Sequence, residues 1–553
     1  MTTDNASVIG ELAQEIFPTG GEAVAARVLE LIAQRKAAPS AGRYKPGPEE
    51  AILITYGDQI QASGEAPLRT LLRFCRERVP FVHTLHLLPF FPYSSDDGFS
   101  VIGYLSVDPE LGDWNDIAAL AAQVRLMFDA VVNHISAQSP WFAAYLAGAE
   151  PYEHLALEVD PAADLSSVVR PRTSPLLTEF ETSAGRKHLW TTFSDDQIDL
   201  NYADPDVLLM VLEVLLDYVD RGASLIRLDA IAFIWKELGT SCMSLPTTHL
   251  IVQLMRAVLD AVAPQVAIIT ETNVPHQENV SYFGDGHNEA QLVYNFALPP
   301  LVLHTLGTGS ARALQQWVAT LTTPSDECWF FNFLASHDGV GLRGVETILT
   351  PQERSMLAER ALAHGGGVGY RNVPDGTMEP YELNINLFDA LSDPTGDEPV
   401  ETQVLRFLCA HSIMLAMPGV PGLYAHSLLG SRSDREAVAR TGVNRAINRE
   451  KLFLDPLLAE LDDPDSLRSR VFTGLMQLLV VRAECPELAP GTSHEVIDTQ
   501  PELIAIRRDG QLTCIHNVTD EPQKVPHGGL DALSGTRLSP GDEIGAYAVV
   551  WLR

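Results

Sequence analysis

Short apolar runs alternate with longer amphipathic segments along most of the chain. The runs are rich in β-branched and aromatic residues and are predicted as strands; eight of them lie at 51–56, 83–91, 125–134, 224–233, 266–272, 292–298, 329–338 and 418–424. Residues 205–222 and 248–264 repeat apolar positions every three to four residues and end at Gly222 and Pro264, as helices do. Eight apolar strands that alternate with helices predict a parallel sheet closed into a (β/α)₈ barrel.

An open doubly wound α/β sheet is the alternative fold. It expects a glycine fingerprint, G-x-G-x-x-G, directly after the first strand. The segment TYGDQIQASG at 55–64 does not contain it. We therefore predict the α/β TIM barrel.

Three regions do not fit a simple barrel. Residues 135–204 and 339–400 are too long for connections and indicate inserted subdomains after strands three and seven. The second insertion contains HGGGVGYRNVPDGT (364–377), which is predicted to be a glycine-rich mobile segment. The third region is the last seventy or so residues, where an Asp509-Gly510 turn indicates a hairpin and predicts a small antiparallel β-domain. We expect these boundaries: an N-terminal helical extension at 1–50, the barrel at 51–134, 205–338 and 395–480, an inserted subdomain at 135–204, an inserted loop subdomain at 339–394, and the β-domain at 481–553.

Composition narrows the class of function. The chain has 38 Lys and Arg against 72 Asp and Glu, a formal net charge of −34, which argues against binding nucleic acid or an anionic membrane surface. No apolar run has the length of a membrane span, and the N-terminus lacks a secretory-signal pattern. Six scattered cysteines without a CxxC pattern fit reduced thiols. We expect a soluble protein that is compatible with the cytoplasm.

Polar residues gather where the predicted strands end, which is where barrels place their active sites. Asp229, Glu271 and Asp338 lie at the carboxyl ends of strands four, five and seven, and are expected to converge on one mouth. Glycosyl transfer needs such a set: one carboxylate attacks the sugar carbon, and another, with a raised pKa, protonates the leaving oxygen. Arg227 lies two residues before Asp229, on the same face of the strand, and can hold that carboxylate ionised.

Each of these residues also has an ordinary structural explanation. A single Asp at a strand end is most often a helix N-cap or part of a loop salt bridge, and His134 alone could be a core histidine. His134 and His337 are suited to donate to sugar hydroxyls. A metal site built from the histidines and carboxylates is the other alternative, but neither HxH nor HExxH occurs. The joint occurrence at several strand ends favours catalysis, with no metal or organic cofactor required.

With these motifs in place, the sequence resembles glycoside hydrolase family 13. The blocks DAVVNH (129–134), ASLIRLDAI (223–231), IITET (268–272) and LASHD (334–338) occur in the order of that family. Further runs, among them LLPFFPYSSDDGF, VVRPRTSPLL and VYNFALPPLVLH, are similar to its sucrose phosphorylase subgroup.

The resemblance implies roles for individual residues. Asp229 would be the nucleophile, Glu271 the general acid/base and Asp338 the transition-state stabiliser. The glucosyl-binding residues would be Asp96, Phe99, His134, Phe193, Gln197, Arg227, His337 and Arg445. Arg172 and Tyr381 match positions for phosphate and acceptor, and Arg371 is a further candidate cation for the phosphate dianion.

The loop VPDGTMEPYELNIN (373–386) departs from sucrose phosphorylases, because Glu379 and Glu382 stand in it. This loop and the N-terminal extension are more similar to glucosylglycerate phosphorylases. The resemblance then implies phosphorolysis of 2-O-α-D-glucosyl-D-glycerate to α-D-glucose 1-phosphate, with net retention. Sucrose, sucrose 6-phosphate and glucosylglycerol remain alternative substrates. A hydrolase or transglucosidase, and a carbohydrate-binding barrel without turnover, are the alternative functions. The subgroup makes a homodimer plausible.

Overall fold

In the computed structural model, eight parallel strands close into a barrel. Each strand overlaps one of the eight predicted runs, so the barrel prediction is confirmed and the open-sheet alternative is wrong. Almost all strand residues are buried, which explains why the runs are apolar throughout rather than alternating. In barrel order the strands are β1 (Ile52–Thr55), β16 (Val420–Tyr424), β12 (Trp329–Phe333), β11 (Leu292–Tyr294), β10 (Ala267–Thr270), β9 (Ala223–Leu228), β4 (Arg125–Ala130) and β3 (Thr84–Leu87).

The structure describes residues 3–35, 42–172, 174–372 and 378–553. By their internal contacts they divide into two compact units. The first unit comprises Met1–Tyr44, His86–Thr272 and Val280–Val293, and the second comprises Lys45–Leu85, Asn273–Asn279 and Tyr294–Arg553. Every helix in the described part of the chain is too short or too polar to span a bilayer. The predicted domain boundaries stay predictions.

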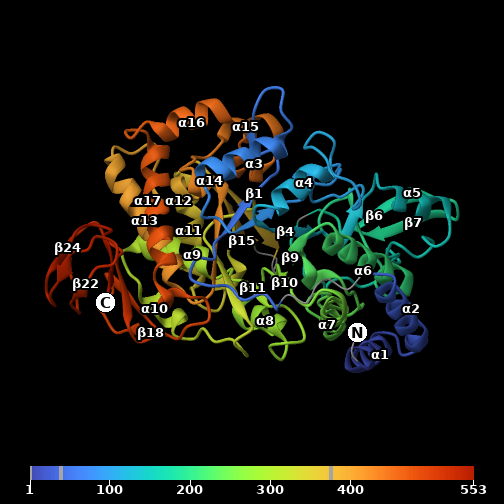
Figure 1. Ribbon diagram of the computed structural model, residues 1–553. Coiled ribbons are helices and arrows are strands. Elements are labelled where there is room, and N and C mark those ends of the chain that lie inside the picture. Colours follow the sequence, from blue (N-terminus) through green and yellow to red (C-terminus); the bar gives the residue numbers. More distant parts are fainter. Residues whose placement is uncertain (1–2, 36–41, 173, 373–377) are drawn as a thin grey trace. The chain divides into compact units, whose positions relative to one another are not determined.

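The first unit contains the paired strands β4, β9, β10 and β11. Their register places Asp129 of β4 beside Arg227 of β9. Helix α1 packs against α2 and α7, as the blue and green helices of Figure 1 show, and the predicted N-terminal helices are confirmed. The helices of this unit are α1 (Thr3–Ile16), α2 (Gly21–Ala33), α4 (Trp114–Ala121), α5 (Pro140–Ala147), α6 (Pro205–Asp220) and α7 (Pro246–Val262).

Two antiparallel pairs occupy the segment between β4 and α6. Strand β6 (Leu177–Thr182) pairs with β7 (Gly185–Trp190), and β5 (His134–Ser136) pairs with β8 (Gln197–Asp199). The second pair sets His134 opposite Asp199. Leu176 and Trp190 pack with Cys242 in a small apolar cluster beneath the hairpin, so this segment has a core of its own.

The second unit carries β1, β12 and β16. Its longer helices are α3 (Pro67–Arg78), α9 (Leu298–Thr308), α10 (Arg312–Val318), α11 (Pro351–Ala363), α13 (Val400–Ala416), α15 (Arg435–Thr441), α16 (Leu454–Asp462) and α17 (Leu467–Ala483). Helix α13 packs against α17 and α9.

A small antiparallel sheet follows β12 and corrects one prediction. It consists of β13 (Val340–Gly341), β15 (Met378–Asn384) and β14 (Gly367–Asn372). Residues 367–372 are therefore a strand, not the predicted mobile segment, because pairing with β15 satisfies the backbone in spite of the glycines. Gly366 permits close approach at this point, since a Cβ there would lie 2.7 Å from the Cβ of Ile385. Residues 373–377 lie outside the described residues.

The C-terminal residues form the predicted antiparallel β-domain, drawn in red in Figure 1. Its main sheet has the order β18 (His494–Ile497), β19 (Leu503–Arg508), β20 (Leu512–Asn517) and β25 (Val549–Leu552). Asp509 and Gly510 have φ angles of 50° and 67°, the positive values that the two central residues of a type I′ turn require. One face of the sheet is apolar and packs around Leu503 and Ile515.

Candidate active site

Asp229 follows the last residue of β9 and is nearly buried. Its N–H donates to the carbonyl oxygen of Ala130 at 3.1 Å, which continues the pairing with β4 by one residue. Arg227 Nη1 lies 2.7 Å from Asp229 Oδ1. The predicted pairing of residues two apart on one strand face is therefore confirmed.

Arg227 is shared by three carboxylates of the first unit. Its Nη1 contacts Asp129 Oδ1 as well as Asp229, and its Nη2 lies 3.9 Å from Glu271 Oε2. Asp129 is fully buried, and its Oδ2 lies 2.7 Å from His86 Nε2. Asp129 and His86 were not among the predicted site residues, although each is a polar residue within a buried apolar strand, which was the signal available.

Glu271 is held beside Asp229 through the main chain. It follows the last residue of β10, and its Oε2 accepts a hydrogen bond of 3.0 Å from the N–H of Ala230. Ala230 has φ 48° and ψ 30°, a left-handed conformation that a residue with a Cβ rarely adopts. Strained backbone of this kind collects at functional sites, where the surrounding structure maintains it.

Burial is the largest influence on the pKa of Asp229. Removal from water raises the pKa of the Asp229 carboxyl above its usual value, and the charge of Asp129 acts in the same direction. Arg227 opposes this rise but is shared with other carboxylates. Arg227 therefore contacts Asp229 as expected, but the net shift of the Asp229 pKa is upward, and the expectation that Arg227 holds Asp229 ionised stays a prediction.

Five of the predicted glucosyl-binding residues of the first unit lie together. His134 Nε2 is 2.8 Å from the carbonyl oxygen of Phe99, to which Gln197 Nε2 also donates at 3.0 Å. The ring of Phe193 packs 5.2 Å from that of His134. The guanidinium of Arg227 lies 5.7 Å from the centre of the Phe99 ring. One cluster therefore brings all five residues together.

A buried ion pair supports this cluster and was missed by the sequence analysis. Lys236 Nζ lies 2.6 Å from Asp199 Oδ2 and donates to Asn133 Oδ1 at 3.1 Å. Asp199 also accepts from Asn133 at 3.1 Å and from the backbone and hydroxyl of Thr192. Lys236 lies in a segment that showed no periodic pattern to indicate its burial.

Asp338 is the predicted carboxylate of the second unit. Arg445 Nη1 contacts its Oδ1, Arg449 Nη2 lies 3.7 Å from the same oxygen, and His337 Nε2 lies 3.5 Å from Oδ2. Arg449 also donates to the carbonyl oxygen of His337 at 3.0 Å. Three predicted residues, His337, Asp338 and Arg445, are thereby brought together.

The remaining predicted residues lie on loops and on the small sheet. Asp96, with φ 53°, begins the 3₁₀ turn that ends at Gly98, and Arg172 and Tyr381 are partly buried. Arg371 Nη2 lies 2.7 Å from Glu346 and 3.2 Å from Glu379. Arg371 is therefore neutralised by its own neighbours, which makes it a poor candidate for binding phosphate.

Other chemistry is sparse among the described residues. No group of three or more His, Cys, Asp or Glu side chains in that part of the chain is arranged to hold a metal ion. The six cysteines are free and buried. Burial raises the pKa of the Cys75 thiol to about 12, which keeps it protonated and unreactive.

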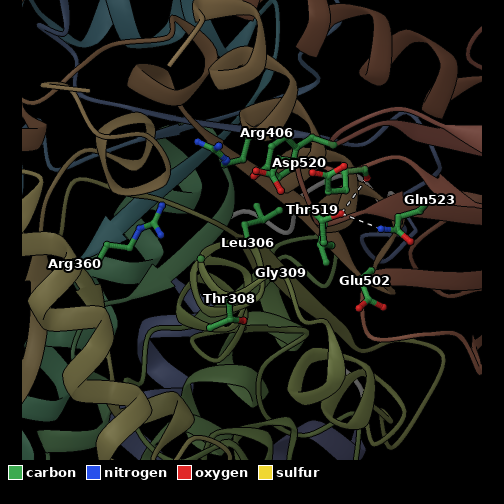
Figure 2. Close-up of a pocket in the computed structure, with 13 residues that line it drawn as sticks. Leu306, Thr308, Gly309, Arg360, Arg406, Glu502, Thr519, Asp520 and Gln523 are labelled. Atoms are coloured by element: carbon green, nitrogen blue, oxygen red, sulfur yellow. Dashed lines mark hydrogen bonds between the residues drawn. The ribbon is translucent and has the colours of Figure 1, made fainter. Parts of the chain in front are cut away.

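A separate cavity of about 550 Å³ lies at the C-terminal end of α9. Figure 2 shows Arg360 and Arg406 on one side of it and Glu502 and Gln523 on the other. Arg360 donates to the carbonyl oxygens of Ala390 and Leu391, the last residues of α12 (Leu387–Leu391), and Arg406 donates to that of Leu391. Both arginines are explained by capping this helix, and none of the predicted site residues lines the cavity.

Comparisons with known proteins identify the family of this chain. The α-amylase catalytic domain matches residues 81–348. A glucosylglycerate phosphorylase of Allomeiothermus silvanus is 51% identical over 490 residues, 88% of each chain. One of Spirochaeta thermophila is 45% identical over 539 residues, 93% of this chain and 91% of its own. The structure of sucrose 6F-phosphate phosphorylase from Thermoanaerobacter thermosaccharolyticum superposes on this one with a TM-score of 0.74 at 23% identity. The match covers 87% of this chain and 95% of that chain, and it supports the fold.

Proposed function

Because this chain belongs to glycoside hydrolase family 13 and, within it, to the group of the glucosylglycerate phosphorylases, we propose that it is a retaining glucoside phosphorylase. It transfers the glucosyl group of 2-O-α-D-glucosyl-D-glycerate to phosphate and releases α-D-glucose 1-phosphate and D-glycerate. The observation that carries the chemistry is the contact of Asp229 and Glu271 with one guanidinium, that of Arg227. A nucleophile and an acid held this way suit double displacement.

In the first step Asp229 attacks the anomeric carbon, and the bond from that carbon to the glycerate oxygen breaks. Glu271 gives its proton to that oxygen, so D-glycerate leaves as an alcohol and a β-glucosyl ester forms on Asp229. In the second step a phosphate oxygen attacks the same carbon, the ester bond breaks, and Glu271 takes the phosphate proton. Two inversions restore the α configuration.

Asp338 stabilises the positive charge that develops on the sugar ring in both steps. Support comes from its position in the loop that follows the carboxyl end of β12, which ends at Phe333, because barrel enzymes work at the carboxyl ends of their strands. The glucosyl unit is bound by a larger set: Asp96, Phe99, His134, Phe193, Gln197, Arg227, His337 and Arg445.

Phosphate and glycerate are both anions, so the acceptor side needs cationic or hydrogen-bonding groups. We assign Arg172 and Tyr381 to this side. Arg371 is left out, because Glu346 and Glu379 already neutralise it.

The partners are small molecules, and we place the reaction in the cytoplasm, where six buried free thiols are stable. A homodimer stays a prediction.

The test is to incubate the protein with phosphate and each of four glucosides, and to measure glucose 1-phosphate and free glucose. We expect the fastest release of α-D-glucose 1-phosphate from glucosylglycerate and little free glucose. Faster release of glucose 1-phosphate from sucrose, sucrose 6-phosphate or glucosylglycerol would show that D-glycerate is not the preferred leaving group. Free glucose formed at a rate independent of phosphate would reject the phosphorylase and indicate a hydrolase.

A further inference from the structure

Glu382 lies in β15 and is nearly fully buried, yet it is outside the mechanism described so far. Its Oε1 accepts hydrogen bonds from the N–H of Gly339 at 2.9 Å and from Arg445 Nε at 3.0 Å. Its Oε2 accepts from Arg445 Nη2 at 3.4 Å. Gly339 directly follows Asp338, so one carboxylate binds both the backbone and the cation next to Asp338.

The guanidinium of Arg445 connects the two carboxylates. One edge, Nε and Nη2, faces Glu382, and the remaining nitrogen, Nη1, contacts Asp338 Oδ1. A guanidinium is planar and rigid, so holding one edge determines where the third nitrogen points. Glu382 therefore sets the direction from which Arg445 reaches Asp338.

Contacts of Glu382 with the backbone around Gly339 also fix the position of Asp338. Strand β13 begins two residues after Asp338 and pairs with β15, with Gly341 opposite Glu382. Gly339 has no side chain at the point of closest approach, and a Cβ there would lie 2.6 Å from Glu382 Cγ. The side chain of Glu382 is thus packed against the main chain that carries Asp338.

We propose that Glu382 is a positioning residue for Asp338, acting through Arg445 and through the N–H of Gly339. This inference rests on the proposed function, because it takes Asp338 as the group that stabilises the transition state. It also gives Glu382 a task different from contact with the acceptor, since its carboxylate is directed at Arg445 and Gly339.

The same strand offers a matched control. Glu379 also lies in β15, but it pairs with Arg371 at 3.2 Å and with Arg354 at 3.9 Å. Neither arginine is among the partners of Asp338 described above. Glu379→Gln therefore removes the same charge from the same strand without loosening Arg445.

The experiment measures fluoride release from α-D-glucosyl fluoride with phosphate present, which attacks the glucosyl ester and frees Asp229 in each turnover. In this reaction Asp229 displaces fluoride from the anomeric carbon, and the leaving group needs no proton. We expect Glu382→Gln to lower kcat about 10- to 100-fold, the loss of a hydrogen bond to a charged group. Glu379→Gln should lower it by less than about threefold, as for a partly exposed ion pair.

A double-mutant cycle separates positioning from a general loss of structure. In an Arg445→Gln background, Glu382→Gln should lower kcat by less than about threefold, because the connecting guanidinium is already gone. Equal losses in both backgrounds would overturn the proposal. Glu382→Asp retains the charge on a shorter side chain and should keep more of kcat than Glu382→Gln; the reverse order would also overturn it.

The fluoride donor makes this test independent of the acceptor. If the wild-type protein released fluoride without phosphorolysing glucosylglycerate, that result would contradict D-glycerate as the acceptor. The double-mutant cycle of Glu382 and Arg445 would still test the role of Glu382. A wild-type protein that releases no fluoride contradicts both the proposed function and the role of Glu382. Melting temperatures of all variants, measured alongside, identify any that have lost the fold.

Discussion

The carboxylates Asp229 and Asp338 follow strands of one barrel but stand in opposite electrostatic settings. Around Asp229, a single arginine serves three carboxylates, and Asp229 is almost removed from water. Around Asp338, whose side chain is 22% exposed, two arginines approach the carboxylate, and one of them, Arg445, is shared with Glu382. The first setting is short of positive charge and the second is not.

This difference suits two different tasks. A nucleophile must give up its negative charge to form a bond, and a scarcity of cations and water leaves its electrons available. A group that stabilises charge without forming a bond must stay ionised and in place, which two guanidiniums achieve. The surroundings, rather than the residue type, thus separate the two roles.

The most severe test of this comparison is Asp229→Asn. Removing the nucleophile should lower glucose 1-phosphate formation by at least about 10⁴-fold, as in enzymes whose nucleophile has been removed. Mass spectrometry should find no glucosyl ester on the variant after reaction with α-D-glucosyl fluoride. If the Asp229→Asn variant carried a glucosyl ester, or turned over at the wild-type rate, another residue would be the nucleophile.

The two arginine settings also predict different losses of stability. Arg227→Met leaves Asp129 and Asp229 buried without their cation and should lower the free energy of unfolding by about 3–5 kcal/mol. Arg449→Met leaves Arg445 on Asp338 and should cost about 1–3 kcal/mol. Urea unfolding of both variants measures the difference. Equal losses would mean that the scarcity of cations around Asp229 has no energetic consequence.

The raised pKa of Asp229 predicts how stability changes with pH. A carboxyl whose pKa is higher in the folded than in the unfolded state favours folding when protonated, and that contribution is lost as pH rises above the unfolded value. Asp229→Asn should therefore be more stable than wild type at pH 7, and the gap should shrink as the solution is acidified. A gap that widens toward acid would reverse the sign of the shift.

The smallest effect is expected at Arg371, which lies on the same small sheet as Glu382. Because Arg371 only pairs with Glu346 and Glu379 near the surface, Arg371→Gln should change the free energy of unfolding by less than about 1 kcal/mol. The KM for phosphate should stay within about threefold of wild type. A large rise in that KM would return Arg371 to the phosphate site, and Arg172→Gln offers the contrasting variant.

The sequence predicted the parts of the fold and the site that depend on local patterns. Eight continuous apolar runs specify buried parallel strands, and the Asp509-Gly510 turn specifies a hairpin, because period and turn geometry are properties of neighbouring residues. The pairing of Arg227 with Asp229 was predictable for the same reason, since residues two apart share one face of a strand. The strand in 367–372 was not, because its glycines have no strand preference and only pairing with β15 orders them.

The sequence alone determined the barrel, the order of its strands and which carboxylates follow them, since each of these is written in short stretches of chain. Tertiary structure decided which charged groups surround the site. Asp129 also pairs with Arg227, Lys236 pairs with Asp199, and Glu382 binds Arg445. Each of these pairs joins residues far apart in the chain. Their strength depends on burial and on distances of a few ångströms, which no local pattern records.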